Sequence, residues 1–385
     1  MNICILGWYG TETIGDRAIL AGIISLLSEK FKDFDVNLGS LYPFYSKRMI
    51  EEDKELYRLL IGKDINFRLF DSKHKKSLEK NIKCSDLLII GGGPLMDLPE
   101  LYMLKYAFRY AKRHNKKKFI YGCGVGPLFK DEYQKIVIDI AKLSDGIILR
   151  DSVSKKNLLN YAKKFNEEIN NKKIYTSFDP AVECAFKYKM YLSKLKQDKN
   201  IDILINLREF PSEYSNSLIS ENVNIVLLRF LENLSKEKRN VRLIPMHYFS
   251  IGSDDRKFLS KLVFNITNNK IYEVQNRPLS LIETMQYFYN AQLNFGMRFH
   301  SVVLQTILNG NNIVLDYTEP TKGKIGGFLK DIDFENFYTN RYFCLQKGDN
   351  VNINLNEFDN KLSSQSIKKY YEQGKNKYNE FNQII

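Results

Sequence analysis

The first 31 residues read MNICILGWYGTETIGDRAILAGIISLLSEKF, from Met1 to Phe31, and this stretch decides the fold class. Its short apolar run predicts a buried β-strand over residues 2–7. Apolar residues then recur at helical spacing over 16–31, at Ile19, Leu20, Ile23, Ile24 and Leu27. A strand, a glycine-containing turn and an amphipathic helix, in this order, begin a β-α-β unit.

The same alternation continues in two sets along the chain. The first set predicts strands and helices in turn over 34–40, 86–90, 100–113, 118–122, 131–143, 146–150, 152–163 and 173–177. The second set predicts them over 201–207, 217–236, 240–245, 253–265, 279–290, 292–295, 299–309 and 312–316. Such alternation indicates parallel sheets that are covered by helices on both faces.

These patterns predict an α/β protein with two doubly wound, Rossmann-like domains that face a cleft. A chain of 385 residues exceeds the usual size of one hydrophobic core, which agrees with two domains. We interpret the Lys- and Tyr-rich stretch 186–200 as the linker, so the predicted domains are 1–190 and 191–385. A polar helix over about 361–380 is expected to cross back onto the first domain, and no sequence repeat relates the two domains.

The amino-acid composition limits the kinds of partner and site that the protein can have. The net charge of +13 is compatible with nucleic acid, an anionic membrane surface or an anionic substrate, but no nucleic-acid-binding motif is present. The five cysteines are isolated and the four histidines scattered, so we expect reduced, mostly buried thiols and no metal site. The start of the chain is typical of a strand rather than of a signal peptide, and no apolar run is long enough to span a bilayer. We therefore expect a cytoplasmic protein, whose only expected membrane contact is a peripheral one at the inner face.

Glycines follow three strands of the first domain. Gly10 lies in the first turn, and we interpret Asp16 as the N-cap of the next helix; a tight turn without a ligand is the alternative. The triplet Gly91-Gly92-Gly93 follows the strand that ends at Ile90, where successive N–H groups can form an anion-binding nest. The series Gly122–Pro127 lacks the spacing of a dinucleotide motif, so we reject a nicotinamide cofactor.

Basic residues follow the strands of the second domain. Arg208 ends the strand 201–207, and its planar guanidinium suits a carboxylate or a phosphate; a surface salt bridge is the alternative. His247 follows the next strand, and we interpret the nearby pair Asp254-Asp255 as helix-capping rather than metal-binding. The most specific cluster is Gly296-Met297-Arg298-Phe299-His300-Ser301, in which Arg298 supplies fixed charge and His300 a proton source. Lys322 and Lys324, after the following strand, add further charge.

Taken in order, these motifs resemble the polysaccharide pyruvyl transferase family. The series that carries the resemblance is G-W-Y-G-T-E-T-I-G-D-R-A-I-L, G-G-G-P-L-M-D, G-C-G-V-G-P-L, L-R-D-S-V-S, D-P-A, N-L-R, I-P-M-H and M-R-F-H-S, from residue 3 to about 332. One departure is Thr13, where the family often has Asn, and the segment from Tyr317 to Gly323 is longer than usual.

The resemblance implies a fold similar to the GT-B glycosyltransferases and no cofactor. It implies that pyruvate passes from phosphoenolpyruvate to two hydroxyls of a sugar, which gives a ketal and releases phosphate. On this basis His300 is the general acid, and Arg298 and Arg208 bind the phosphate and carboxylate of phosphoenolpyruvate. The expected substrate-binding residues are Gly91, Gly92, Gly93, Gly10, Asp16, His247, Lys322 and Lys324, with the glycine loops on the side of a saccharide acceptor that is free or lipid-linked.

Two other functions fit the same patterns. A GT-B glycosyltransferase that uses a nucleotide sugar would share the fold and the cleft. A scaffold that kept the fold and lost the chemistry is a third hypothesis, and the intact Arg298 and His300 argue against it.

Overall fold

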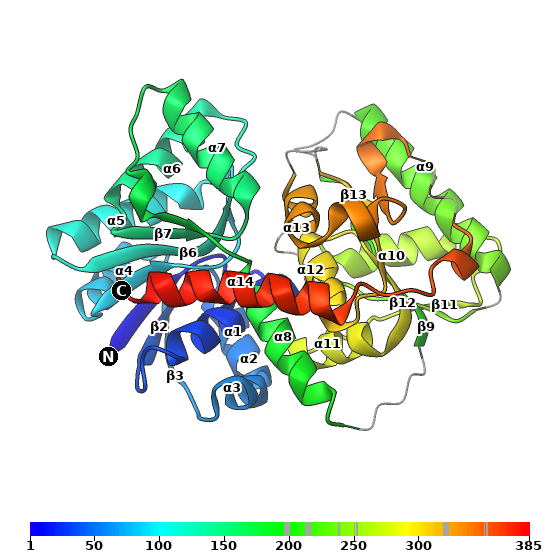
Figure 1. Ribbon diagram of the computed structural model, residues 1–385, viewed down its shortest axis with the longest axis horizontal. Coiled ribbons are helices and arrows are strands. Elements are labelled where there is room, and N and C mark those ends of the chain that lie inside the picture. Colours follow the sequence, from blue (N-terminus) through cyan, green and yellow to red (C-terminus); the bar gives the residue numbers. More distant parts are fainter. Residues whose placement is uncertain are drawn as a thin grey trace. The chain divides into compact units, whose positions relative to one another are not determined.

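The structure is a computed structural model that describes residues 1–195, 201–211, 217–237, 239–249, 251, 253–318, 323–349, 351 and 353–385. It divides into two compact units (Figure 1). Unit 1 contains Met1–Lys187 and Lys369–Ile385, and unit 2 contains Tyr188–Lys368. The division falls within two helices, α8 (Pro180–Leu192) and α14 (Ser364–Asn382), which each belong partly to both units.

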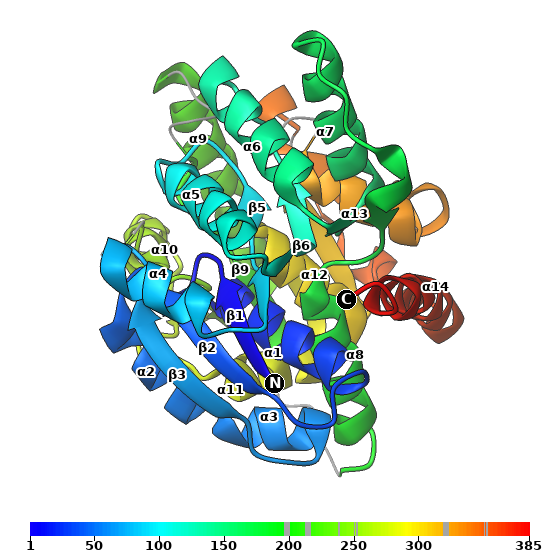
Figure 2. The same cartoon turned by 90° about the vertical axis from the view of Figure 1, so that its left-hand side faces the viewer.

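Unit 1 is built around a parallel sheet. Its strand order is β3-β2-β1-β4-β6-β7-β8, with the short β5 beside β6. The strands are β1 (Asn2–Leu6), β2 (Asp35–Ser40), β3 (Asn66–Asp71), β4 (Leu87–Ile90), β5 (Pro94–Leu95), β6 (Lys117–Val125), β7 (Gly146–Leu149) and β8 (Ile174–Thr176). The helices are α1 (Ile14–Ser28), α2 (Pro43–Glu52), α3 (Lys54–Ile61), α4 (Lys75–Lys83), α5 (Glu100–Arg113), α6 (Asp131–Leu143) and α7 (Ser152–Lys164). Figure 2 shows β1, β2 and β3 side by side.

Unit 2 repeats this arrangement with an unrelated sequence. Its sheet is also parallel and has the order β11-β10-β9-β12-β13-β14. The strands are β9 (Ile201–Asn206), β10 (Val241–Leu243), β11 (Tyr272–Val274), β12 (Ala291–Gly296), β13 (Asn312–Asp316) and β14 (Tyr342–Cys344). The helices are α9 (Ser217–Leu234), α10 (Asp255–Phe264), α11 (Leu281–Asn290), α12 (Phe299–Leu308) and α13 (Lys324–Ile332). In both sheets the chain runs outward over three strands, returns to the middle and continues the other way, so each unit has the Rossmann-like order.

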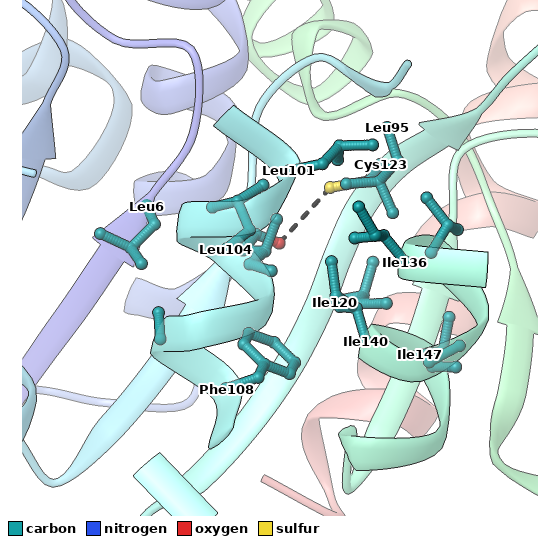
Figure 3. Packing of buried hydrophobic residues seen from close by; sticks show 14 of the residues in the cluster. Leu6, Leu95, Leu101, Leu104, Phe108, Ile120, Cys123, Ile136, Ile140 and Ile147 are labelled. Atoms are coloured by element: carbon teal, nitrogen blue, oxygen red, sulfur yellow. Dashed lines mark hydrogen bonds between the residues drawn. The ribbon is translucent and has the colours of Figure 1, made fainter. Parts of the chain in front are cut away.

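These sheets confirm the predicted fold class. The central strands are buried on both faces because helices cover both, which is why they appear in the sequence as apolar runs, whereas the edge strands β3 and β11 are partly exposed. Figure 3 shows one face of unit 1, where side chains of β1, α5, β6 and α6 interlock around Ile120 and Phe108. Cys123 lies in this core and its thiol donates to the Ile90 carbonyl; burial raises its pKa to about 12, so the thiol stays protonated. As predicted, most of the cysteines are buried: four are buried and Cys84 is exposed.

The division between the two units, after Lys187, falls within the stretch 186–200 that was predicted as the linker. The stretch predicted as linker begins at 186, but α8 continues through it to Leu192. Buried residues such as Tyr188 and Leu192 give this end of α8 a packed face, which the abundance of lysine and tyrosine hides in the sequence. Residues 196–200 of the predicted linker lie outside the described residues.

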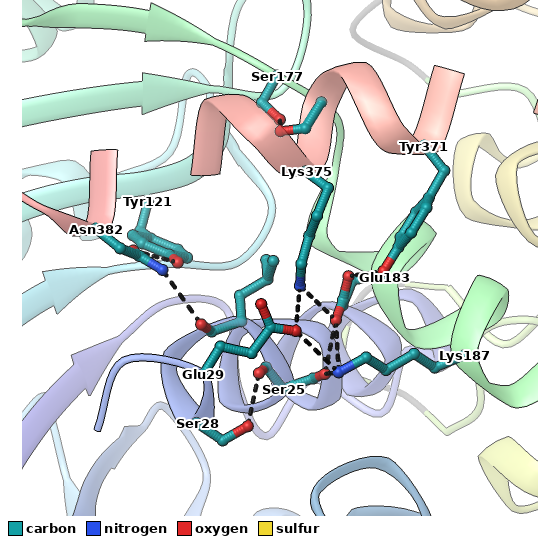
Figure 4. A network of polar contacts seen from close by, with 12 residues as sticks. Ser25, Ser28, Glu29, Tyr121, Ser177, Glu183, Lys187, Tyr371, Lys375 and Asn382 are labelled. Carbon is teal, nitrogen blue, oxygen red and sulfur yellow. Dashed lines mark hydrogen bonds and ion pairs between the residues drawn. The ribbon is translucent and has the colours of Figure 1, made fainter. Parts of the chain in front are cut away.

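The C-terminal part of α14 packs on unit 1 through polar contacts (Figure 4). Glu183 of α8 is fully buried and accepts hydrogen bonds from Ser25, Tyr371 and Lys375. Burial opposes the charge of Glu183, but Lys375 and Lys187 outweigh it and hold the pKa of this carboxyl below its usual range. Because three helices meet at one charged group, α14 is fixed to α1 and α8 in one position.

Candidate active site

The two central strands of unit 2 bring the predicted arginines together. β9 pairs with β12, and Asn206 at the end of β9 is the register partner of Gly296 at the end of β12. The strand order reverses between these two strands, and ligands of open α/β sheets bind in the crevice beyond such strand ends. Arg208 and Arg298 each lie two residues beyond this pair, so both stand at the switch point of unit 2.

Asn206 holds the loops after the two strands in register. Its buried side chain donates to the Ile244 carbonyl at 2.9 Å and accepts from the Arg298 N–H at 3.1 Å. Its carbonyl accepts from the Met297 N–H at 3.1 Å. The Arg298 backbone is therefore fixed in an extended conformation at the N-cap of α12, and α12 begins with Phe299 and His300.

The Arg298 guanidinium is oriented by a buried carboxylate. Its Nε and Nη2 lie 2.7 and 2.5 Å from the two oxygens of Asp255. Asp255 also accepts from the backbone N–H groups of Met246 and His247, at 3.0 and 3.1 Å. A bidentate pair of this kind fixes the plane of the guanidinium and joins the loop after β10 to the start of α12. His247 is thereby held close to Arg298 through its main chain.

The acidic pair divides its roles. Asp254 is the N-cap of α10 and accepts from the Arg256 N–H, which confirms the capping interpretation for this residue. Asp255 is fully buried and serves the Arg298 pair instead. The described residues contain no group of acidic, histidine and cysteine side chains that could hold a metal ion.

Arg208 faces a tyrosine rather than a carboxylate. Its Nη1 lies 3.4 Å from the Tyr317 hydroxyl, its guanidinium carbon lies 5.0 Å from the centre of that ring, and its Nε donates to the Glu209 carbonyl. Burial and the neighbouring Arg298 both lower the pKa of Arg208. Within unit 2 the charge of Arg208 is therefore less compensated than that of Arg298, which has Asp255 as its partner.

Tyr317 lies among three cations. Lys324, at the start of α13, places its Nζ 5.8 Å from the centre of the Tyr317 ring. Burial raises the pKa of Tyr317, but Lys324, Arg208 and Arg298 outweigh burial and lower it to about 8. Three cations that stabilise a phenolate would stabilise other anions at the same place. The neighbouring Asp316 is buried, which raises its pKa to about 6, and it accepts from Thr318 and Tyr342.

Phe299 and His300 occupy the first turn of α12. The Phe299 side chain is buried, packs edge-on against Phe328 at 6.3 Å between ring centres, and lies 5.9 Å from the Lys324 Nζ. The His300 ring packs edge-on against Phe299 at 5.0 Å and is partly exposed. Phe299 is therefore a packing residue that fixes the orientation of His300, at a helix N-terminus that favours anions.

In unit 1, the structure corrects the role of Asp16. The N-cap of α1 is Thr13, whose hydroxyl accepts from the Asp16 N–H at 3.2 Å. Asp16 lies in the first turn, where its carboxylate accepts from the hydroxyls of Thr11 and Thr13. The prediction that Asp16 is the N-cap was wrong. Asp is a good N-cap residue, but Thr13, three residues earlier, takes that position. Gly10 lies beside these residues with φ of +89°, and a Cβ there would meet the backbone of Tyr42 at 2.7 Å.

The glycine triplet packs against the first loop. Gly92 and Gly93 have φ of +114° and +70°, and a Cβ on them would overlap Tyr9 and Trp8. A Cβ on Gly91 would lie 2.5 Å from Ile23. Close packing and left-handed backbone therefore account for these glycines by themselves. Binding of a ligand by this loop stays a prediction.

The structure thus gathers Arg208, Arg298, His300 and Lys324 in unit 2, with His247 beside them, and Gly10, Asp16 and the glycine triplet in unit 1. Lys322 lies outside the described residues. The sequence interpretation missed Tyr317 as a partner of the cations. Its position directly after an apolar strand, like that of Arg208, was the available signal.

Solved structures with a similar fold are glycosyltransferases and sugar-nucleotide epimerases. An S. aureus MnaA–UDP structure has a TM-score of 0.55 at 11% identity, over 97% of this chain and 87% of that one. A putative UDP-N-acetylglucosamine 2-epimerase from Listeria monocytogenes has a TM-score of 0.53 at 13% identity, over 82% and 78%. A glycosyltransferase from Rickettsia africae has a TM-score of 0.53 at 13% identity, over 98% and 93%. At such identities the likeness shows the GT-B-like fold alone.

Comparison of sequences identifies the family. No curated protein matches the chain. The family model described as polysaccharide pyruvyl transferase matches residues 14–319, which include the loops after β4, β9 and β12 as well as Arg208, Arg298 and His300. The chain therefore belongs to the polysaccharide pyruvyl transferase family.

Proposed function

We propose that this protein transfers a pyruvyl group from phosphoenolpyruvate to a sugar of a cell-surface polysaccharide or of its lipid-linked precursor. Membership of the family supports transfer onto a polysaccharide. The proposal that phosphoenolpyruvate is the donor rests on one observation. Arg208, Arg298 and Lys324 cluster around Tyr317 at the switch point of unit 2. Phosphoenolpyruvate carries a phosphate and a carboxylate, and two arginines with a lysine match these two anionic groups.

In the proposed reaction, the imidazolium of His300 donates a proton to the methylene carbon of phosphoenolpyruvate. The central carbon gains oxocarbenium character, and one sugar hydroxyl adds to it. The bond from this carbon to the phosphate oxygen then breaks, and the phosphate leaves with the electron pair. A second hydroxyl closes the ketal. Of the two hydroxyl protons, one restores the acid on His300 and one goes to the phosphate, so the protons balance.

The arginines have separate tasks in this scheme. Arg298 is fixed by Asp255 and by the N-cap geometry of α12, so it offers a rigid donor to the departing phosphate. Arg208 is held by neutral oxygens and its charge is less compensated, which suits the carboxylate that remains in the product. The expected saccharide acceptor belongs to the glycine loops of unit 1, and no cofactor takes part in the scheme.

The decisive experiment incubates the protein with phosphoenolpyruvate and candidate saccharide acceptors, and measures phosphate release together with the mass of a pyruvate ketal. A nucleotide-sugar glycosyltransferase is the second candidate because the similar fold occurs in structures solved with UDP. A thermal shift with UDP or GDP sugars and none with phosphoenolpyruvate would favour that candidate. A shift with phosphoenolpyruvate and a product heavier by a pyruvyl group would exclude it.

A further inference from the structure

One part of the unit 1 surface combines exposed aromatic rings with lysines. The loops after β2 and β3 lie side by side, because Ser72 donates to the Ser40 carbonyl through both its N–H and its hydroxyl at 3.0 Å. The Lys73 Nζ lies 3.8 Å from the centre of the Tyr42 ring, which joins the two loops through a cation–π contact. We define the cationic–aromatic surface by its exposed side chains, Tyr42, Phe44, Lys47, Lys73, Lys75 and Lys76.

Phe44 is unusual on this surface. It is 79% exposed in the first turn of α2, while Ser46 and Met49 of the same helix face the interior. A phenylalanine in this position contributes almost nothing to the core of unit 1. Its neighbour Tyr42 is 40% exposed, so two rings project together next to the lysines. Aromatic side chains flanked by lysines are typical of surfaces that enter the headgroup region of a bilayer.

The lysines are also badly placed for the stability of the helix that carries them. α4 begins with Lys75 and Lys76 after the N-cap His74, and no acidic residue lies in its first turn. Positive charges at a helix N-terminus oppose the helix dipole, so this arrangement weakens α4. Glu79 lies 3.9 Å from Lys75 and offsets part of its charge, but Lys73 and Lys76 remain exposed. A negatively charged partner would relieve the repulsion.

The cationic–aromatic surface is continuous with the loop after β1. The Leu41 N–H donates to the Tyr9 carbonyl at 2.9 Å, and the Tyr42 backbone touches Gly10 so closely that a Cβ there would overlap it. The Gly10 loop is where the expected acceptor would lie. An acceptor that is attached to a membrane lipid presents its sugar close to the headgroups, so a bilayer at this surface would bring the sugar to that loop.

We infer that the cationic–aromatic surface of unit 1 docks on an anionic lipid bilayer, with Phe44 and Tyr42 in the headgroup region and the lysines against the lipid phosphates. Within the described residues no helix is long and apolar enough to cross a membrane. The docking goes beyond the proposed transfer and does not depend on it, since it requires neither phosphoenolpyruvate nor an acceptor.

The test measures sedimentation of the full chain with vesicles of phosphatidylcholine alone and with vesicles that contain about 30 mol% of the anionic lipid phosphatidylglycerol. We expect the native protein to bind the anionic vesicles and to be released by salt. The variant Lys73→Gln/Lys75→Gln/Lys76→Gln should lose about tenfold or more in partition, since each lysine contributes to attraction by anionic lipid. The matched control, Lys112→Gln/Arg113→Gln/Lys117→Gln, removes the same charge from exposed positions at the end of α5 and the start of β6 and should bind like the native protein.

The rings are tested with a second pair of variants. Phe44→Trp places a fluorophore on the surface, and Phe264→Trp places one at the 84% exposed position of α10 in unit 2, while the native Trp8 is buried in both. Brominated phosphatidylglycerol should quench the tryptophan at 44 and leave the one at 264 unchanged. Absence of binding to anionic vesicles, equal loss in the two triple variants, or equal quenching at 44 and 264 would each overturn the inference. Unchanged melting temperatures verify that every variant is folded.

Discussion

Unit 1 and unit 2 have the same strand order, yet the arginines near the edges where their strands end are compensated differently. In unit 1, the arginines near this edge are neutralised: Arg17 binds Asp53 through two hydrogen bonds, and Arg150 is buried beside Asp151 and Asp179. In unit 2, Arg298 is paired with Asp255 in the same way, but Arg208 donates to neutral oxygens and shares Tyr317 with Lys324. The same topology therefore pairs these arginines with carboxylates in unit 1 and leaves Arg208 without a carboxylate partner in unit 2, and the difference lies in where carboxylates are placed.

His300 tests the site most directly. His300→Ala should lower phosphate release by about 10²–10⁴-fold, because it removes the proposed proton donor while the arginines remain. The measurement is phosphate release from phosphoenolpyruvate under saturating acceptor. His114→Ala is the control, since His114 is exposed at the end of α5 and takes no part in the scheme. Unchanged turnover in His300→Ala would refute its role as the acid.

The arginines of the two units should respond in opposite ways. Arg17→Gln leaves Asp53 buried without its cation and should lower the free energy of unfolding by about 3–5 kcal/mol. Arg208→Gln removes a charge that burial and Arg298 already disfavour, so stability should be unchanged or higher. Its phosphoenolpyruvate affinity should fall about tenfold or more, as expected when a hydrogen bond between charged groups is lost. Calorimetry with and without phosphoenolpyruvate separates the effect on stability from the effect on phosphoenolpyruvate affinity. Equal destabilisation by Arg17→Gln and Arg208→Gln would contradict the proposed difference between the two units.

The pH dependence of unit 2 should reveal Tyr317. Above about pH 8 the phenol ionises and partly neutralises Arg208, Arg298 and Lys324, so phosphoenolpyruvate affinity should fall about tenfold by pH 9.5. The pKa of Tyr317 is lowered by folding, so its contribution to stability is present above the unfolded pKa and is lost as pH falls through about 8. Stability should therefore rise over the window in which affinity falls.

Tyr317→Phe supplies the control for that profile. It should bind phosphoenolpyruvate with an affinity that no longer decreases between about pH 7.5 and pH 9.5, a range that includes the Tyr317 pKa of about 8. A profile that stays identical to that of the native protein would show that another group titrates.

The smallest expected effect concerns the first turn of unit 1. Thr13→Ala should lower the free energy of unfolding by about 1 kcal/mol, because the N-cap of α1 is lost. Thr13→Asn should leave it nearly unchanged, since Asn is an equally good N-cap. Urea unfolding measures both. A loss of transfer activity in Thr13→Asn at native stability would show that this turn also contacts substrate.

The sequence by itself determined the fold class, the positions of most strands and the identity of the cationic loops. Apolar runs and helical spacing are local signals, and residues that follow a parallel strand must lie at one edge of the sheet. Arg208, Arg298 and His300 could therefore be selected without a structure. The sequence did not show that α8 continues to Leu192, because the burial of this helix is set by its neighbours rather than by its composition.

Only the tertiary structure decided which charged groups compensate one another. Asp255 holds Arg298, Tyr317 lies among three cations, and Lys73 covers the ring of Tyr42. Each of these arrangements depends on contacts between residues that are far apart in the chain. Electrostatic energy depends on distance and burial, and neither quantity is encoded in local spacing. The sequence was sufficient to select residues of the candidate site, whereas the packing of the strands and helices determined their charge state and their partners.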